Sequence, residues 1–183
     1  MNQHPDYVLN KINGPKDLKK LSFEELSKLP DEMRQLVLEK DAAIGGHVGP
    51  NLGIMEVTTA FHYVFDAPKD KIVFDVSHQS YGHKMLTGRK NAFLDPDCYN
   101  DVTGYTNPDE SEYDCFTVGH TSTSVSLATG LAQGRDLLSG KENIVAVIGD
   151  GSLSGGLAFE GFNNASVLDS NLIIVINDNQ MSI

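Results

Sequence analysis

The chain has 183 residues, of which 40% are hydrophobic and 21% are charged, as in an ordinary globular protein and unlike a disordered one. Fourteen basic residues against 25 acidic ones give a formal net charge of −11, which disfavours nucleic acid as a partner. A phosphorylated ligand would therefore need a metal ion or backbone N–H groups to overcome the field of the protein. The two cysteines, Cys98 and Cys115, match neither a disulfide framework nor a zinc-binding pattern.

The sequence carries no signal for a membrane. Residues 1–17 lack an apolar run after a basic region, so they do not resemble a signal peptide. No apolar stretch approaches the length of about 18 residues that a membrane-spanning helix requires. We therefore expect a cytoplasmic protein with no membrane partner.

The N-terminal part is predicted to be helical. Residues 1–21 are polar and are interpreted as an arm that packs on something else, while residues 22–183 are interpreted as one domain. Ser22 and Glu25 have the spacing of a capping box, and apolar residues then recur at helical spacing. Because Pro30 interrupts this pattern, we expect a short helix followed by a second one over 31–39.

The middle of the chain mixes loops with short elements. Residues 45–53 are rich in glycine and predict a loop, whereas residues 54–65 have helical periodicity. Residues 72–76 predict a buried strand, 78–89 a loop entering a short helix, and 91–113 mostly loop. The polar and glycine-rich segments therefore lie between elements rather than within them.

The last third predicts a strand–helix–strand unit. A helix over 122–138 precedes two fully apolar runs, 143–148 and 171–176, which flank a helical segment over 155–168. Strands that are apolar at every residue are covered on both faces, as in parallel α/β sheets. The carboxyl ends of the two strands then open on the same edge, where ligands of α/β proteins usually bind.

Oxygen ligands follow both of these strands. Asp150 follows the first and Asn179 the second, 29 residues later in the sequence. A carboxylate and an amide oxygen suit Mg²⁺, which prefers hard oxygen ligands and keeps places for phosphate oxygens. The backbone carbonyl of Met181 is a candidate third ligand.

The turn around Asp150 also suits a diphosphate. Its flanking glycines allow close approach of a bulky anion, and Gly151 and Ser152 can donate backbone N–H groups to it. The N-terminus of the following helix adds favourable potential. Each half alone is typical of a tight turn or an Asx turn. The pair, at the spacing of one strand–helix–strand passage, is the signature of thiamine diphosphate binding.

Several motifs resemble the N-terminal part of 1-deoxy-D-xylulose-5-phosphate synthase, a relative of transketolase, from about Leu9 onward. Asn51-Leu52 and the His78 segment favour the synthase over ordinary transketolase. The resemblance implies an α/β three-layer sandwich with a mostly parallel sheet. This is the diphosphate-binding (PP) domain of the thiamine-diphosphate-binding fold, truncated at its C-terminal end. The segments that carry the resemblance are 45–53, 75–84, 86–89, 119–124, 149–151 and 177–183.

The resemblance also implies an activity and its cofactors. The family's enzymes join pyruvate and glyceraldehyde 3-phosphate, with loss of CO₂, to 1-deoxy-D-xylulose 5-phosphate, in isoprenoid precursor and thiamine biosynthesis. Carried over by motif, Asp150, Asn179 and the Met181 carbonyl hold Mg²⁺. By the same resemblance, Gly151, Ser152 and Asn179 contact the diphosphate end of thiamine diphosphate.

Histidine-bearing segments complete the implied site. The resemblance places His78 and the loop Gly119-His120-Thr121 against the cofactor, with His47 and His78 facing the reacting carbon as acid/base or hydrogen-bonding groups. Without the motif, His47 and His78 are equally well interpreted as surface or capping histidines. For His120, the backbone can be the part that matters. His62 lies mid-helix and is interpreted as a packing residue.

The chain departs from the family in two ways. The family's enzymes are several times longer, and their pyrimidine-binding domain, with the glutamate that protonates the cofactor's ring, has no counterpart here. We therefore expect no turnover by this chain alone. Residues 105–108 stand where the family often has basic residues. This leaves open a transketolase-like paralogue with another sugar substrate, a non-catalytic cofactor-binding module, or a structural domain with a vestigial site.

The apolar strand near the end of the sequence bears on partners. Residues 172–176 are expected to lie at an exposed edge, because nothing follows them to supply a neighbouring strand. Exposed apolar edges tend to pair with another chain. We therefore expect either a homodimer or a complementary pyrimidine-binding chain as partner.

Overall fold

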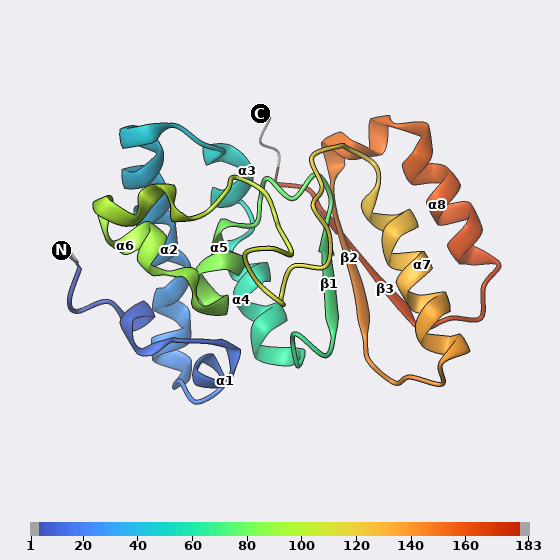
Figure 1. Cartoon of the computed structure of the whole chain (residues 1–183), viewed down its shortest axis with the longest axis horizontal. Helices are drawn as coiled ribbons and strands as arrows, with labels where there is room; N and C mark the ends of the chain where they lie inside the picture. The colour runs from blue at the N-terminus through green and yellow to red at the C-terminus, as the bar shows by residue number, and fades with distance from the viewer. Residues whose placement is uncertain (1–3, 180–183) are drawn as a thin grey trace. The chain divides into compact units, whose positions relative to one another are not determined.

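The computed structural model describes residues 4–179, which divide into two compact units (Figure 1). The first, called here the helical unit, comprises residues 4–66 and 79–104 of the described chain. The second, called the sheet unit, comprises residues 67–78 and 105–179. Each unit is described by itself.

The helical unit is built from short helices around one long one, and it contains no strand among its described residues. The predicted helix over 54–65 is confirmed as α4, while the glycine-rich segment expected to be a loop contains the short helix α3. The elements are η1 (Val8–Lys11), α1 (Pro15–Leu18), α2 (Phe23–Ile44), α3 (Val48–Leu52), α4 (Met55–Val64), α5 (Tyr81–Lys84), η2 (Met85–Arg89), α6 (Asn91–Leu94) and η3 (Pro96–Asp101).

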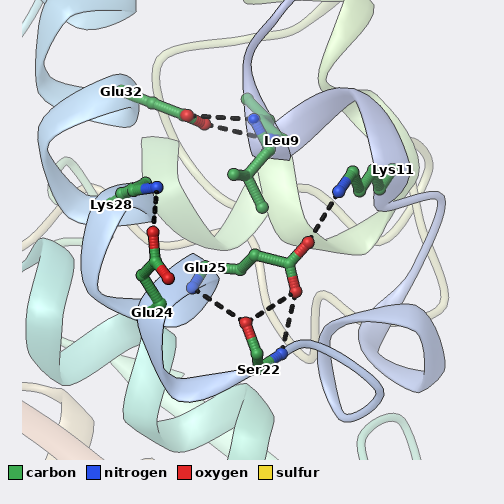
Figure 2. Close-up of polar contacts among 8 residues, drawn as sticks. Leu9, Lys11, Ser22, Glu24, Glu25, Lys28 and Glu32 are labelled. Carbon is green, nitrogen blue, oxygen red and sulfur yellow. Dashed lines mark hydrogen bonds and ion pairs between the residues drawn. The ribbon is translucent and has the colours of Figure 1, made fainter.

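Helix α2 begins at the predicted capping box. The Ser22 hydroxyl accepts the backbone N–H of Glu25, and the Glu25 carboxylate accepts the backbone N–H of Ser22 at 2.9 Å (Figure 2). The prediction of two helices separated at Pro30 is wrong, because α2 continues through this residue to Ile44. An interior proline costs about 3 kcal/mol, but the apolar face of α2 is buried on both sides of it. The fully buried residues of that face are Leu29, Met33, Leu36 and Val37.

Residues 4–20 pack into the core of the helical unit. Glu32 of α2 accepts the backbone N–H groups of Val8 and Leu9 at 2.9 and 3.0 Å (Figure 2). The Lys90 ammonium donates to the backbone carbonyl of Ile12 at 2.6 Å, and also to those of Leu9 and Asn10. Although this segment is polar overall, three of its apolar side chains have no exposed surface, namely Leu9, Ile12 and Leu18.

The sheet unit has the α/β organisation that the sequence predicts. Its three strands lie in the order β1-β2-β3 and are all parallel. Helix α8 connects β2 to β3, so the predicted strand–helix–strand unit is confirmed. The elements are β1 (Lys71–Phe74), α7 (Ser124–Leu137), β2 (Ile144–Gly149), η4 (Asp150–Ser154), α8 (Gly156–Ser166) and β3 (Leu172–Asn177).

The core of the sheet unit lies between helix α7 and one face of the sheet. Alternate residues of β2 point to this face, among them Ala146 and Ile148, and pack on fully buried residues of α7 such as Val125 and Ala128. Strand β3 pairs only with β2 among the described residues, and its side chains are mostly half-buried, with Ile176 52% exposed. The central strand is therefore well covered, whereas β3 is an edge with partly exposed apolar side chains.

Between residues 4 and 179, no helix combines the length and the apolar composition needed to cross a bilayer.

Candidate functional site

The two predicted metal-binding segments lie at the same edge of the sheet. Strands β2 and β3 are parallel, and Gly149 is paired in register with Asn177. Asp150 follows directly after Gly149, and Asn179 lies two residues beyond Asn177. Because neighbouring strands are about 4.8 Å apart, both segments leave the sheet close together. The third predicted ligand, Met181, lies outside the described residues, and the role of the three as metal ligands stays a prediction.

A short 3-10 helix follows β2 and places the predicted diphosphate contacts. Element η4 begins at Asp150, and α8 starts only at Gly156. The N–H groups at the tip of β2 are therefore those that begin η4. Asp150 and Gly151 are exposed, whereas Ser152 is buried with 8% of its surface accessible. Of the two residues predicted to donate N–H groups to a diphosphate, Gly151 is thus the more open.

Five glycines lie at this edge, and contacts with neighbouring residues require glycine only at Gly155 among them. None of the other four has a positive φ, and an added Cβ would meet nothing within 4 Å among the described residues. Open glycines also occur within α7, but only here do they surround the end of a strand. Bare backbone in such a place leaves room for a ligand to approach closely. The four glycines are Gly119, Gly149, Gly151 and Gly156.

The predicted cofactor loop 119–121 is held against both neighbouring segments of the sheet unit. The carboxylate of Asp75, at the end of β1, accepts the backbone N–H groups of Ser122 at 2.9 Å and Ser124 at 2.8 Å. The Ser122 hydroxyl donates to the backbone carbonyl of Ser152 at 2.6 Å. The structure therefore brings together the ends of β1 and β2 and the loop that precedes α7.

The ring of His120 is oriented by its own loop. His120 is exposed, and its Nδ1 lies 3.0 Å from the backbone carbonyl of Thr121, so this nitrogen is the donor of the pair. The Thr123 hydroxyl donates to the His120 carbonyl at 3.1 Å. Both contacts stay within the loop, so the loop presents an exposed imidazole of defined orientation.

His78 follows a strained turn at the end of β1. Val76 and Ser77 have φ values of 58° and 70°, which a β-branched residue such as Val76 rarely adopts. The Ser77 hydroxyl accepts the backbone N–H of Thr106 at 3.0 Å, which helps to hold the turn. Strain of this kind persists where surrounding contacts enforce it, often at functional sites. Because β1 is parallel to β2, His78 lies at the same edge of the sheet as Asp150.

His47 belongs to the helical unit and has its own set of contacts there. Its Nδ1 lies 3.2 Å from the Tyr81 hydroxyl, which also accepts the His47 backbone N–H at 3.3 Å. Asn51 donates to the His47 carbonyl and accepts the backbone N–H of Tyr81. Burial lowers the pKa of His47 below its usual 6.5, while a hydrogen bond with the Gly104 backbone acts in the opposite direction. At neutral pH this imidazole is therefore uncharged and able to accept a proton.

A buried carboxylate lies beside the glycine-rich segment of the helical unit. Asp41 is 8% exposed, and neither of its side-chain oxygens has a hydrogen-bond partner within the described chain. Burial raises its pKa from 3.8 to about 6, although the charge of Lys40 opposes this. A Cβ at Gly46 would lie 2.2 Å from Oδ1 of Asp41, so glycine is required at position 46 while Asp41 keeps this position.

His62 is a packing residue with a histidine partner, as its mid-helix position indicated. It has no exposed surface, and its Nε2 lies 2.9 Å from Nδ1 of His83, which is also buried. Burial, followed by the charges of His83, Arg89 and Lys19, lowers the pKa of His62 well below 6.5. The pair is therefore uncharged at His62 and belongs to the core of the helical unit.

Sequence reasoning missed Asp75, Ser122 and Tyr81. The predicted strand over 72–76 includes Asp75, whereas β1 ends at Phe74, and the hydrogen-bond partners of Asp75 lie 47 and 49 residues away in the sequence. The hydroxyl of Ser122 lies in a run of serines and threonines that reads as a helix start. Only the fold shows which of these hydroxyls reaches Ser152.

The proteins that the chain resembles are several times longer than it is. The family profile described as 1-deoxy-D-xylulose-5-phosphate synthase matches residues 9–183. The chain is similar to the protein of that name from Syntrophomonas wolfei subsp. wolfei, at 51% identity over 97% of the chain and 28% of the relative. The corresponding protein from Dictyoglomus turgidum is 52% identical over 96% of the chain and 28% of the relative. A chloroplastic relative from Oryza sativa subsp. japonica is 49% identical over 96% of the chain and 24% of its own length.

Proposed function

The chain belongs to the 1-deoxy-D-xylulose-5-phosphate synthase family, and on this premise we propose that it binds thiamine diphosphate through Mg²⁺. The proposed site is the C-terminal edge of the parallel sheet in the sheet unit. The observation that carries the proposal is the group of four open glycines around Asp150 at that edge. In a chain of net charge −11, bare backbone N–H groups and a divalent cation are the means by which a diphosphate is held.

Each predicted residue has a role in this proposal. Asp150, Asn179 and the Met181 carbonyl would hold Mg²⁺, and Gly151, Ser152 and Asn179 would contact the diphosphate. The loop Gly119-His120-Thr121 would contact the cofactor beside His78. When bound, thiamine diphosphate supplies the stabilised carbanion that the chemistry of this family requires. His78 would exchange protons or hydrogen bonds with substrate oxygens, and we propose the same role for the uncharged His47 of the helical unit.

The activity proposed is that of a larger protein. The chain spans about 28% of the length of the curated bacterial relatives it matches. We propose that the complete protein condenses pyruvate with glyceraldehyde 3-phosphate in the cytoplasm, giving 1-deoxy-D-xylulose 5-phosphate and CO₂ for isoprenoid precursor synthesis. The chain alone is expected to bind cofactor and to turn over no substrate. Product formation by the purified chain with cofactor, Mg²⁺ and both substrates would contradict this.

Calorimetric titration tests the cofactor proposal directly. Thiamine diphosphate is titrated into the chain with Mg²⁺ and again with a chelator, and then into Asp150→Ala with Mg²⁺. We expect binding only with Mg²⁺, and at least a tenfold weaker affinity, roughly, for Asp150→Ala, because removing a ligand or its support typically costs about 10- to 100-fold.

Asp169→Ala is the matched control for Asp150→Ala. It removes the same charge from an exposed residue just before β3, at the opposite edge of the same sheet. We expect its affinity to equal that of the unaltered chain. Equal losses in the two variants would mean that only net charge matters, and no binding by the unaltered chain would reject the proposal.

The edge strand β3 supports a proposal about partners. Its single neighbour among the described residues and its partly exposed apolar side chains, including Ile176, favour pairing with a second chain. We propose a homodimer or a complex with a complementary pyrimidine-binding chain. Sedimentation at micromolar concentration should show self-association of the isolated chain, and a clean monomer would contradict the homodimer.

A further inference from the structure

Asp75 occupies the place that a helix cap normally fills. Helix α7 begins at Ser124, and its own N-cap residue, Thr123, makes no side-chain capping bond. The first N–H groups of a helix need acceptors, and a negative charge near them is favourable. The Asp75 carboxylate provides both, since its two oxygens accept the N–H groups of Ser122 and Ser124 from the end of β1.

A cap supplied by a neighbouring strand restrains the loop before the helix as well as the helix itself. An N-cap within the same loop would satisfy α7 but leave the loop able to move as a body. Asp75 instead ties residue 122 to the end of β1, three residues before His78. With no exposed surface of its own, Asp75 has no direct access to a ligand at the edge.

Ser122 extends this restraint to the tip of β2. Its hydroxyl donates to the Ser152 carbonyl at 2.6 Å, within the turn that Asp150 begins. Its φ of 69° is unfavourable for a non-glycine residue, so the surrounding contacts must hold it. A Cβ at Gly155 would lie 2.1 Å from the Ser122 hydroxyl, so glycine at 155 makes this contact possible.

We propose that Asp75 is a positioning residue for cofactor binding, which acts through Ser122 to hold loop 119–121 in register with the turn at Asp150. The inference rests on the proposed function of this edge. Asp75 then determines the shape of the site without contacting the ligand. The diphosphate does not bind at the N-terminus of α7, because the Asp75 carboxylate already accepts N–H groups there.

The test compares two buried aspartates at opposite ends of one strand. Asp75 follows β1, whereas Asp70 precedes it, is 7% exposed, and accepts the Asn143 backbone N–H at 2.7 Å at the other edge of the sheet. We would measure thiamine diphosphate affinity with Mg²⁺ for Asp75→Asn and Asp70→Asn, at a temperature where circular dichroism shows both to be folded. Thermal unfolding of each variant is recorded alongside.

The expected results separate positioning from stability. Both variants should unfold at lower temperature, but only Asp75→Asn should lose affinity, by roughly tenfold, as changes behind directly bound ligands typically do. Equal affinities for the two variants would overturn the inference. If the unaltered chain itself binds no cofactor, the failure lies with the proposed function and removes the basis of the inference as well.

A second variant keeps the test decisive should Asp75→Asn not fold. Ser122→Ala retains both N–H groups that Asp75 accepts and removes only the bond to the Ser152 carbonyl. We expect a folded protein with roughly threefold weaker affinity, since one neutral hydrogen bond contributes about 1 kcal/mol or less. Unchanged affinity in this variant would overturn the proposed route through Ser122.

Discussion

Asp75 in the sheet unit and Asp41 in the helical unit are both buried aspartates, but they differ in what surrounds them. Both oxygens of Asp75 accept backbone N–H groups, at 2.9 and 2.8 Å. Neither oxygen of Asp41 accepts any in the described chain, and its pKa is raised to about 6 by burial. Burial alone therefore does not decide whether a carboxylate stabilises a fold. The hydrogen bonds that replace water decide it.

The comparison predicts opposite signs for removing the two charges. A partnered carboxylate is part of the structure, and its loss leaves N–H groups buried without acceptors. An unpartnered carboxylate strains the protein whenever it ionises, and its loss relieves that strain. The following four changes test or sharpen this contrast.

The largest effect is expected for Asp75→Ala. The substitution leaves the Ser122 and Ser124 N–H groups buried without their acceptor and removes the cap of α7. Each such loss costs about 1–3 kcal/mol, so we expect a total destabilisation of about 3 kcal/mol. Urea unfolding measures it, and a loss below about 1 kcal/mol would show that water replaces the carboxylate easily.

Asp41→Asn should stabilise the protein, and only above mildly acidic pH. Because the folded state holds the Asp41 proton up to about pH 6, stability contributed by the protonated group is lost as pH rises from 3.8 through about 6. The variant should therefore be more stable by about 1–2 kcal/mol at pH 7.5 and equal to the parent below pH 3.8. Asp31→Asn, which removes the same charge from an exposed aspartate on the same helix, is the control.

The His62–His83 pair should give the opposite pH dependence within the same unit. The pKa of His62 is lowered well below 6.5, so its contribution to stability is complete above pH 6.5 and is lost as pH falls. We expect the parent to lose about 1 kcal/mol more than His62→Gln between pH 7 and pH 5. His120→Gln, which makes the same substitution at an exposed histidine, is the control.

The smallest effect is expected at the surface, for Glu25→Gln. Hydrogen bonds from Lys11 and then Ser22 lower the pKa of Glu25 to about 2, so its contribution is present above pH 4.5 and lost as pH falls toward 2. Glutamine can still close the capping box, so only the pair with Lys11 is removed (Figure 2). The melting temperature should fall by no more than about 3 °C. Glu24→Gln, which breaks a pair within α2, is the matched control.

The sequence could predict the elements whose pattern is local. The apolar runs at 143–148 and 171–176 required covered parallel strands, and the connection between them required Asp150 and Asn179 to share an edge. The capping box at Ser22 is likewise a local signal, and it is confirmed. These expectations succeed because a few neighbouring residues determine each of them.

The features that the sequence could not predict depend on distant partners. Pro30 stays helical because the α2 face on both sides of it is buried, which local propensity does not include. Asp75 finds its acceptor role only when loop 119–124 comes back to the end of β1. Met181, the third expected ligand, lies outside the described residues, and the role of all three residues as metal ligands stays a prediction.

The hydrogen bonds from Lys90 to the N-terminal segment determine where the chain can be shortened. Shortening the chain to begin at Ser22, as its polar composition invites, would remove Leu9, Ile12 and Leu18 from the interior and uncover the apolar side of α2. It would also strip the Lys90 ammonium of three carbonyl acceptors. Such a trimmed form should accumulate as insoluble material, so purification tags are better added ahead of the intact segment than substituted for it.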